Sequence, residues 1–135
     1  MQFFVIFLMI LPLGAPTATL VYGLILIGLS ALVGFLALSK NRLGNFNIRP
    51  DIKEDCTLVT TGIYGLIRHP MYTAVLMSML GVLVIYPMVY EYVLFGVLLI
   101  TLLIKLFYEE SMWKCESQEY RDYIKTTKRL IPYIF

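Results

Sequence analysis

Apolar residues fall into two long stretches of the chain, which are separated by a polar connection and followed by a polar tail. Residues 1–39 contain no charged side chain, and a second, mostly apolar stretch runs from Pro70 to about Tyr108. Each stretch is nearly twice the roughly 20 apolar residues that one membrane helix needs. The pattern therefore predicts an all-α chain with two pairs of apolar helices.

Proline and glycine residues predict where each stretch turns back. Pro12, Gly14 and Pro16 interrupt the first stretch, which predicts helices over about 3–13 and about 17–38. Tyr86-Pro87 interrupts the second stretch and predicts helices over about 70–85 and about 92–108. Because a helix rises only about 1.5 Å per residue, the first of the four either crosses a bilayer or enters it in part.

The composition places most of the chain in lipid and fits one domain over residues 1–135. Apolar residues make up 59% and charged residues only 15% of the 135 residues, whereas soluble domains have about 25% charged residues. Within this domain, residues 1–39 form a helical hairpin, and residues 40–135 supply a loop, a helix pair and a tail. The net charge of +2 gives no reason to expect a nucleic-acid partner. The two cysteines and the single histidine lack the spacing of a metal site, so we expect no metal.

Basic residues indicate the orientation of the chain. They gather in the connection over 40–68 and in the tail after residue 109. Cytoplasmic loops of membrane proteins carry an excess of lysine and arginine, so both segments are predicted to be cytoplasmic. The two helices predicted between these segments lead the chain across the membrane and back, so both segments can lie on the same side. Four spans result if the first helix crosses the membrane, and three if it does not.

The single histidine, His69, lies where the polar connection meets the third predicted helix. Pro70 follows it, and proline is favoured at the first position of a helix because it has no N–H to leave unpaired. Arg68 and His69 should therefore lie at a helix N-terminus, where free N–H groups and the positive end of the helix dipole favour an anion. The alternative is that these residues only anchor the helix at the membrane interface.

Several ordered motifs give the chain a resemblance to a known enzyme family. Residues 45–135 resemble the isoprenylcysteine carboxyl methyltransferases, whose wider relatives are the phospholipid N-methyltransferases. The motifs are Asn45-Phe46-Asn47, Thr57-Leu58-Val59-Thr60, Gly62-Ile-Tyr64, Arg68-His69-Pro70-Met71-Tyr72, Glu109-Glu110, Glu119-Tyr120-Arg121-Asp122-Tyr123 and Leu130-Ile-Pro132.

The resemblance implies an integral membrane enzyme that transfers a methyl group from S-adenosylmethionine. Its cofactor site would lie on the cytoplasmic side, in the loop and tail. Arg68 would supply a cation for the amino-acid end of the cofactor, and Glu109 or Glu110 would pair its ammonium or offset its sulfonium. The other positions that match the family's cofactor residues are Thr57, Leu58, Val59, Tyr64, His69, Pro70, Met71 and Tyr72. Tyr64 and Tyr72 could instead be interfacial aromatic residues.

The chain departs from the family at three positions that bear on the site. Lys105 stands where the carboxyl methyltransferases have an arginine thought to meet the substrate's carboxylate. A lysine keeps the positive charge but cannot make the two parallel hydrogen bonds that a guanidinium forms with a carboxylate. The Lys105 side chain could instead extend from the helix end to water. Cys56 replaces a histidine that is common in the animal enzymes. The glycine before Glu119 is missing, which leaves open whether Glu109 or Glu110 is the functional glutamate.

These residues predict methyl transfer to an acceptor dissolved in the lipid bilayer. We assign the catalytic roles to Lys105 and Glu109, and the carboxylate of a prenylated cysteine or a similar lipid-borne acid is the leading acceptor. A carboxylate acceptor is already ionised, so its methylation needs alignment, exclusion of water and a neutralising cation rather than a general base. N-methylation of an aminolipid is the alternative, and a non-catalytic membrane interaction protein is the alternative from another class.

Overall fold

The computed structural model describes residues 2–11, 16–40, 58–116 and 118–135. Its helices are α1 (Gln2–Ile10), α2 (Leu20–Lys40), the 3-10 helix η2 (Gly62–Gly65), α3 (Pro70–Ile85), α4 (Val89–Glu116) and α5 (Gln118–Thr126). These ranges contain no strand, only one isolated parallel bridge, so the all-α prediction is confirmed there. The motif Asn45-Phe46-Asn47 and the positions Cys56 and Thr57 lie outside the described residues.

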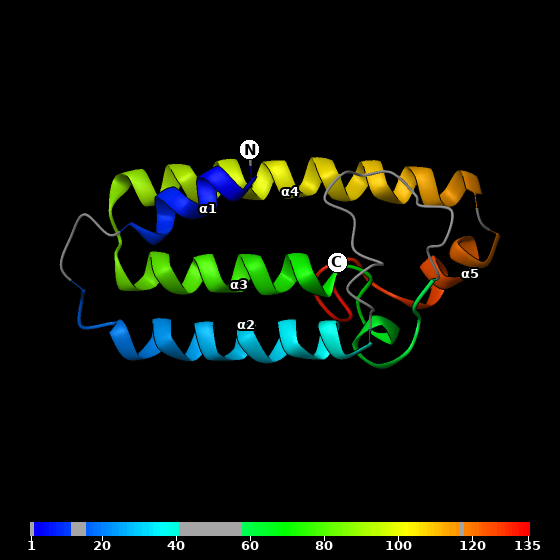
Figure 1. The fold of residues 1–135 in the computed structure, drawn as a ribbon, viewed down its shortest axis with the longest axis horizontal. Coiled ribbons are helices and arrows are strands. Elements are labelled where there is room, and N and C mark those ends of the chain that lie inside the picture. Colours follow the sequence, from blue (N-terminus) through cyan, green and yellow to red (C-terminus); the bar gives the residue numbers. More distant parts are fainter. Residues whose placement is uncertain (1, 12–15, 41–57, 117) are drawn as a thin grey trace.

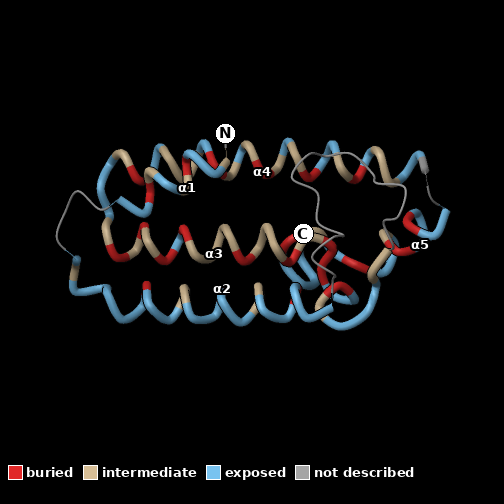
Figure 2. The backbone as a smooth tube through the Cα atoms, in the orientation of Figure 1, coloured by how far each residue is buried: buried red, intermediate tan, exposed pale blue. Residues whose placement is uncertain are grey.

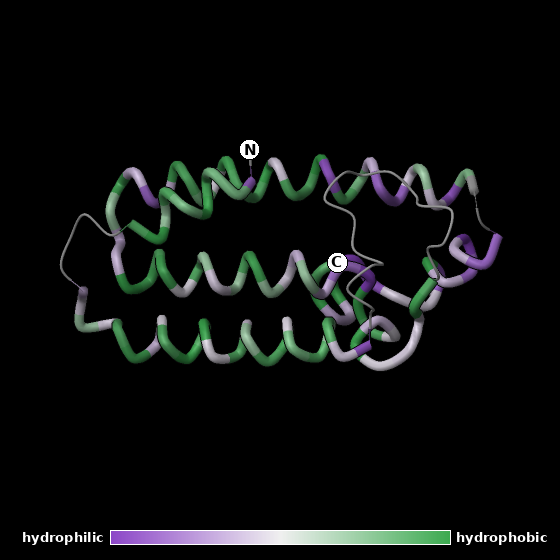
Figure 3. The backbone as a smooth tube through the Cα atoms, in the orientation of Figure 1, coloured by the Kyte–Doolittle hydropathy of each residue, from purple (hydrophilic) through white to green (hydrophobic). Residues whose placement is uncertain are grey.

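Three long helices, α2, α3 and α4, run side by side, and α1 lies along α4 at the end of the bundle away from the C-terminus (Figure 1). A core cluster joins α1, α3 and α4 through Val5, Met9, Met79, Leu98 and Leu102. Figure 2 shows that the outer side of α2 is largely exposed, and Figure 3 shows that the same helix is apolar along most of its length. An exposed apolar surface of this extent is typical of lipid contact rather than of a soluble protein.

Small residues bring α2 and α3 into close contact. A Cβ atom at Gly23 would lie 2.3 Å from Cγ1 of Ile85, and one at Gly81 would lie 2.7 Å from Cγ1 of Ile27. One turn or more further along, the hydroxyl oxygens of Ser30 and Ser78 are 2.5 Å apart. Small residues and interhelical hydroxyl contacts are typical of helix packing in membranes, where neighbouring backbones approach closely. Helix α3, which begins at the candidate site, is thus held firmly along one side.

Within the described ranges, two helices are long and apolar enough to cross a bilayer, namely Leu20–Lys40 and Val89–Cys115. Helix α3 has 16 residues, or about 24 Å at 1.5 Å per residue, and α1 has nine residues, or about 14 Å. The hydrocarbon core of a typical bilayer is about 30 Å thick. The described helices therefore agree with membrane association, while the count of four spans stays a prediction.

Most predicted helix bounds agree with the structure, but one does not. The third predicted helix and α3 share the bounds Pro70–Ile85, while the first and second shift by up to three residues at either end. The predicted end of the fourth helix at Tyr108 is wrong, because α4 continues to Glu116. The charged residues after Tyr108 therefore do not end the helix. Consequently Glu109 and Glu110 lie inside a helix.

Candidate functional site

The candidate site forms where the N-terminus of α3 meets the C-terminal segment of the chain. Ile67 and Lys128 form the parallel bridge. The Arg68 N–H donates to the Lys128 carbonyl at 2.7 Å, and the His69 N–H donates to the Arg129 carbonyl at 3.0 Å. The N–H groups of Arg68 and His69, which precede the first residue of α3, are therefore paired with the tail. Such pairing joins residues about 60 positions apart, and no local pattern reveals it.

Glu110 lies at the centre of a buried ion network. Its residue is 1% exposed. Arg68 Nε lies 2.8 Å and His69 Nε2 lies 3.3 Å from Oε1 of Glu110. Arg129 Nε lies 3.1 Å from Oε2 of the same carboxylate. Two guanidinium groups and an imidazole thus satisfy both oxygens, which is what a buried carboxylate requires to remain ionised.

Arg68 is committed to the protein's own chain. Its residue is 8% exposed, and besides Glu110 its Nη1 donates to the carbonyl oxygens of Thr127 and, at 3.3 Å, Ile124. These carbonyls lie at the C-terminal end of α5, where a positive charge is favourable. Arg68 therefore links α5 and α4 to the start of α3.

Glu109 has a different environment from its neighbour. The Tyr72 hydroxyl donates to Oε1 of Glu109 at 2.7 Å, and Lys105 Nζ lies 4.0 Å from the same oxygen. His69 Nδ1 lies 3.9 Å from Oε2, too far for a hydrogen bond. The Glu109 side chain is 19% exposed against 2% for Glu110. Glu109 is thus a partly accessible carboxylate with one oxygen that no hydrogen bond from the described residues occupies.

Aromatic stacking completes this face of the site. The rings of His69 and Tyr72 stack with centroids 5.4 Å apart and planes 4° apart. Lys105 Nζ lies 5.5 Å from the centroid of the Tyr72 ring, within the range of a cation–π contact. His69, Tyr72, Lys105 and Glu109 therefore form one group, which we call the Glu109 face. It combines a carboxylate, a cation, an imidazole nitrogen and two stacked rings.

The remaining predicted residues lie near this group without joining it. Pro70 and Met71 form the first turn of α3. Tyr64 is buried in η2, and its carbonyl accepts a hydrogen bond from the Tyr123 hydroxyl. Leu58 and Val59 are half-buried in the segment that leads to η2. The structure therefore brings together His69, Tyr72, Lys105 and Glu109, with Arg68 and Glu110 behind them.

Sequence reasoning missed Arg129 and Tyr123 as residues of the site. The resemblance places the cofactor site in the loop and tail and includes the Glu119-Tyr120-Arg121-Asp122-Tyr123 motif, but it assigns no site role to a single residue of the tail. Burial raises the pKa of the Tyr123 hydroxyl to about 12, so the hydroxyl keeps its hydrogen and donates it to Tyr64. A signal for Arg129 was present in the two adjacent glutamates, since a buried carboxylate needs cationic partners.

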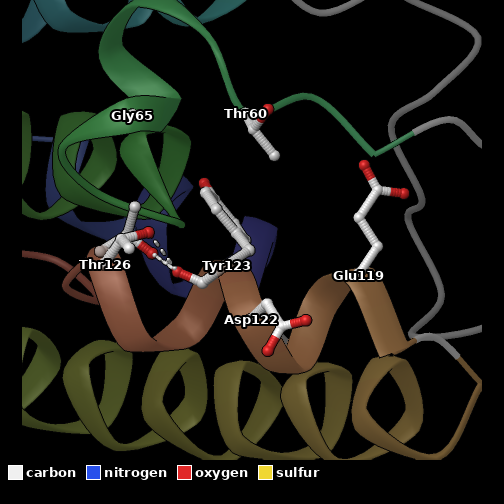
Figure 4. A pocket seen from close by; sticks show the side chains of 7 residues that line it. Thr60, Gly65, Glu119, Asp122, Tyr123 and Thr126 are labelled. Atoms are coloured by element: carbon white, nitrogen blue, oxygen red, sulfur yellow. Dashed lines mark hydrogen bonds between the residues drawn. The ribbon is translucent and has the colours of Figure 1, made fainter.

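An open groove of about 390 Å³ lies between residues 60–65 and α5 (Figure 4). Its walls are Thr60, Gly65, Glu119, Asp122, Tyr123, Thr126 and Thr127. None of the predicted cofactor residues lines it. The groove and the Glu109 face are therefore separate features with no lining residue in common.

Comparison with known families agrees with the geometry. No curated protein matches the chain in sequence. The sequence model of the phospholipid methyltransferase family matches residues 18–115. This range covers α2, α3 and nearly all of α4, and includes the whole Glu109 face; only α1 and the tail lie beyond it. The match is consistent with the resemblance to the isoprenylcysteine carboxyl methyltransferases and their wider relatives. The chain therefore belongs to the phospholipid methyltransferase family of membrane methyltransferases.

Proposed function

We propose that this protein transfers a methyl group from S-adenosylmethionine to an acceptor dissolved in the membrane, with the carboxylate of a prenylated cysteine or a similar lipid-borne acid as the leading acceptor. The observation that carries the proposal is the Glu109 face. There, a partly accessible carboxylate and a cation 4.0 Å apart lie beside a stacked imidazole and phenol. This group can meet a positively charged cofactor and a negatively charged acceptor at one place.

The chemistry of the Glu109 face fits the cofactor. S-adenosylmethionine carries a sulfonium and an ammonium, and when bound it supplies a methyl group activated by the positive sulfur. Glu109 has an oxygen available for such a cation, and His69 Nδ1 lies 3.9 Å from that oxygen. Tyr72 fixes the carboxylate through its other oxygen. We assign the direct contacts to His69, Tyr72 and Glu109.

The other cofactor positions have supporting roles in this proposal. Arg68 and Glu110 hold the site together rather than contact the cofactor, because their charged groups are bonded to each other and to the tail. These contacts favour Glu109 over Glu110 as the functional glutamate. The remaining positions rest on the family resemblance: Thr57, Leu58, Val59, Tyr64, Pro70 and Met71.

Lys105 is the proposed partner of the acceptor's carboxylate. Its side chain is 15% exposed and directed towards Glu109 and the Tyr72 ring. An ammonium in such surroundings can neutralise an incoming carboxylate. The acceptor oxygen is already ionised, so the protein must only align it with the methyl group.

N-methylation of an aminolipid is the second candidate, and one observation favours it. Methylation of an ammonium first requires removal of a proton. His69 Nε2 lies against Oε1 of Glu110, and Nδ1 has no hydrogen bond from the described residues. Because a carboxylate only accepts, Nε2 carries a hydrogen, and in the neutral ring Nδ1 can accept one. The family's description as phospholipid methyltransferases also accords with this candidate.

We further propose one domain over residues 1–135, with about four membrane helices and the Glu109 face on the cytoplasmic side. The basic residues of 40–68 and of the tail support this orientation. Helix α4 extends past the apolar segment with Lys114 exposed in its last turn. This end of α4 lies at the same end of the bundle as the N-terminus of α3 (Figure 1).

The deciding experiment offers two acceptors to the purified protein in nanodiscs. Methyl-labelled S-adenosylmethionine is supplied with a farnesylcysteine analogue in one reaction and with an aminolipid in the other. Label in the farnesylcysteine product supports the leading acceptor, whereas label in the aminolipid supports the second candidate. Absence of S-adenosylhomocysteine binding by folded protein would instead favour a non-catalytic membrane protein.

A further inference from the structure

We propose that Arg129, in the C-terminal tail, is a positioning residue that fixes the orientation of His69 by holding Glu110. The inference rests on the proposed function of the Glu109 face. The family match ends at residue 115, so it assigns no part to this residue.

The carboxylate of Glu110 links Arg129 to His69. Arg129 Nε binds Oε2 at 3.1 Å, while His69 Nε2 lies 3.3 Å from Oε1, which Arg68 also contacts at 2.8 Å. Each oxygen therefore has its own set of donors, and rotation of the carboxylate would break both sets. With Nε2 held against Glu110, Nδ1 is the nitrogen that faces Glu109. The neutral ring then presents an accepting atom to the Glu109 face.

Arg129 is itself held on several sides. Its carbonyl accepts the His69 N–H at 3.0 Å. Its guanidinium carbon lies 5.2 Å from the centroid of the Phe107 ring and 5.3 Å from that of Phe135. Planar guanidinium groups favour such aromatic contacts. The same residue thus contacts the backbone of His69 and the carboxylate that orients its ring.

The chain around Arg129 is anchored too. The Thr73 hydroxyl donates to the Leu130 carbonyl at 2.8 Å. The Leu130 and Ile131 N–H groups donate to the Phe135 carbonyl at 2.7 and 2.9 Å. The last residues therefore curl back on themselves beside the start of α3. This geometry restricts the position from which the Arg129 side chain reaches Glu110.

Loss of the Arg129 charge should change the hydrogen bonding of the His69 ring. Oε2 of Glu110 would lose its Arg129 hydrogen bond while Arg68 and His69 remain on Oε1, and a buried oxygen without a donor favours rotation or protonation of the carboxylate. Either change alters what His69 Nε2 meets at Oε1. The imidazole could then exchange its hydrogen between Nε2 and Nδ1, which would place a donor rather than an acceptor opposite Glu109.

The single histidine makes this inference directly measurable. In protein labelled with ¹⁵N-histidine, the ring nitrogen signals come from His69 alone and report which nitrogen carries hydrogen. We expect the wild-type protein to show hydrogen on Nε2. Arg129→Met should shift these signals towards a mixture and weaken S-adenosylhomocysteine binding about tenfold, the effect of one lost charge-assisted hydrogen bond. Arg121→Met is the matched control, since Arg121 is exposed on α5 and should leave both readouts unchanged.

A second variant keeps the test possible if Arg129→Met does not fold. Arg129→Gln keeps a donor without the charge, and it should give a smaller shift in the same direction. Wild-type signals and affinity in either folded variant would overturn the inference and leave Arg129 a purely structural residue. If the wild-type protein binds no S-adenosylhomocysteine but Arg129→Met still shifts the His69 signals, the proposed function fails while the positioning role stands.

Discussion

The Tyr72 hydroxyl donates to Oε1 of Glu109 at 2.7 Å and so connects the first turn of α3 with the C-terminal third of α4. Tyr72→Phe removes this bond but keeps the ring that stacks on His69. We expect S-adenosylhomocysteine affinity to fall by about three- to tenfold, the effect of one net hydrogen bond. Calorimetry in nanodiscs measures it. Tyr108→Phe, at an exposed position of α4, is the control, and an equal effect of both changes would remove the role of the Tyr72–Glu109 bond.

Substitution of Glu109 should mainly affect cofactor binding, whereas substitution of Glu110 should mainly affect folding stability. Glu109→Gln should cost more cofactor affinity, because Glu109 has the accessible oxygen. Glu110→Gln should cost more folding stability, about 3–5 kcal/mol, because it breaks a buried ion network. Thermal unfolding and S-adenosylhomocysteine titration of both variants test the pair of statements. A greater affinity loss in Glu110→Gln would show that the assignment of the two residues is reversed.

Lys105 tests the identity of the acceptor. Lys105→Met keeps the apolar stem, so helix packing should survive, and the variant should raise KM or lower kcat for an acidic acceptor at nearly constant cofactor affinity. Lys105→Arg should retain or improve this activity, because a guanidinium matches a carboxylate with two hydrogen bonds. For an aminolipid acceptor, removal of the cation should be neutral or favourable. Full activity of Lys105→Met on a farnesylcysteine analogue would exclude Lys105 as the acceptor's partner.

The close contact of α2 with α3 predicts opposite outcomes at two glycines of one helix. Gly23→Ala places a methyl group 2.3 Å from Ile85 and 2.6 Å from the Gly81 carbonyl, so it should destabilise the protein by about 1–3 kcal/mol. At Gly28 a Cβ meets nothing within 4 Å. Gly28→Ala should be neutral or slightly stabilising, since alanine favours the helix more than glycine. The melting temperatures of the two variants give the comparison, and a similar value for both would contradict this packing.

Local signals in the sequence predicted the helices well wherever proline marked their ends. The start of α3 at Pro70 and its end before Tyr86-Pro87 follow from residue types alone. The end of α4 could not be predicted in this way. Charged residues after Tyr108 predict that the chain leaves the lipid there, but a helix need not end at such a change, and α4 continues as far as Glu116.

The candidate site was predicted in part, and the missing part depends on long-range contacts. The motifs identified His69, Tyr72, Lys105 and Glu109 as site residues, and these four lie together in the structure. The choice between Glu109 and Glu110 could not be made from sequence. Adjacent helix residues point about 100° apart, and only the packing of the tail decides which of them is enclosed.

The position of the tail determines what surrounds the start of α3. The first N–H groups of a helix lack partners within it, and this is the basis of the anion site expected at Arg68 and His69. In the structure the N–H groups of Arg68 and His69 donate to the carbonyls of Lys128 and Arg129. No periodic pattern in the tail predicts this pairing. The anion site at this helix end stays a prediction.

Binding of S-adenosylhomocysteine to the wild-type protein and to His69→Ala is the most direct test of the Glu109 face as the cofactor site. Calorimetry should show binding to the wild-type protein in nanodiscs. His69→Ala should weaken this binding by about 1–3 kcal/mol, because it removes a hydrogen-bonding group beside Glu109. Thermal unfolding of both proteins confirms that they are folded. No binding by folded wild-type protein, or the same affinity in His69→Ala, would contradict the assignment.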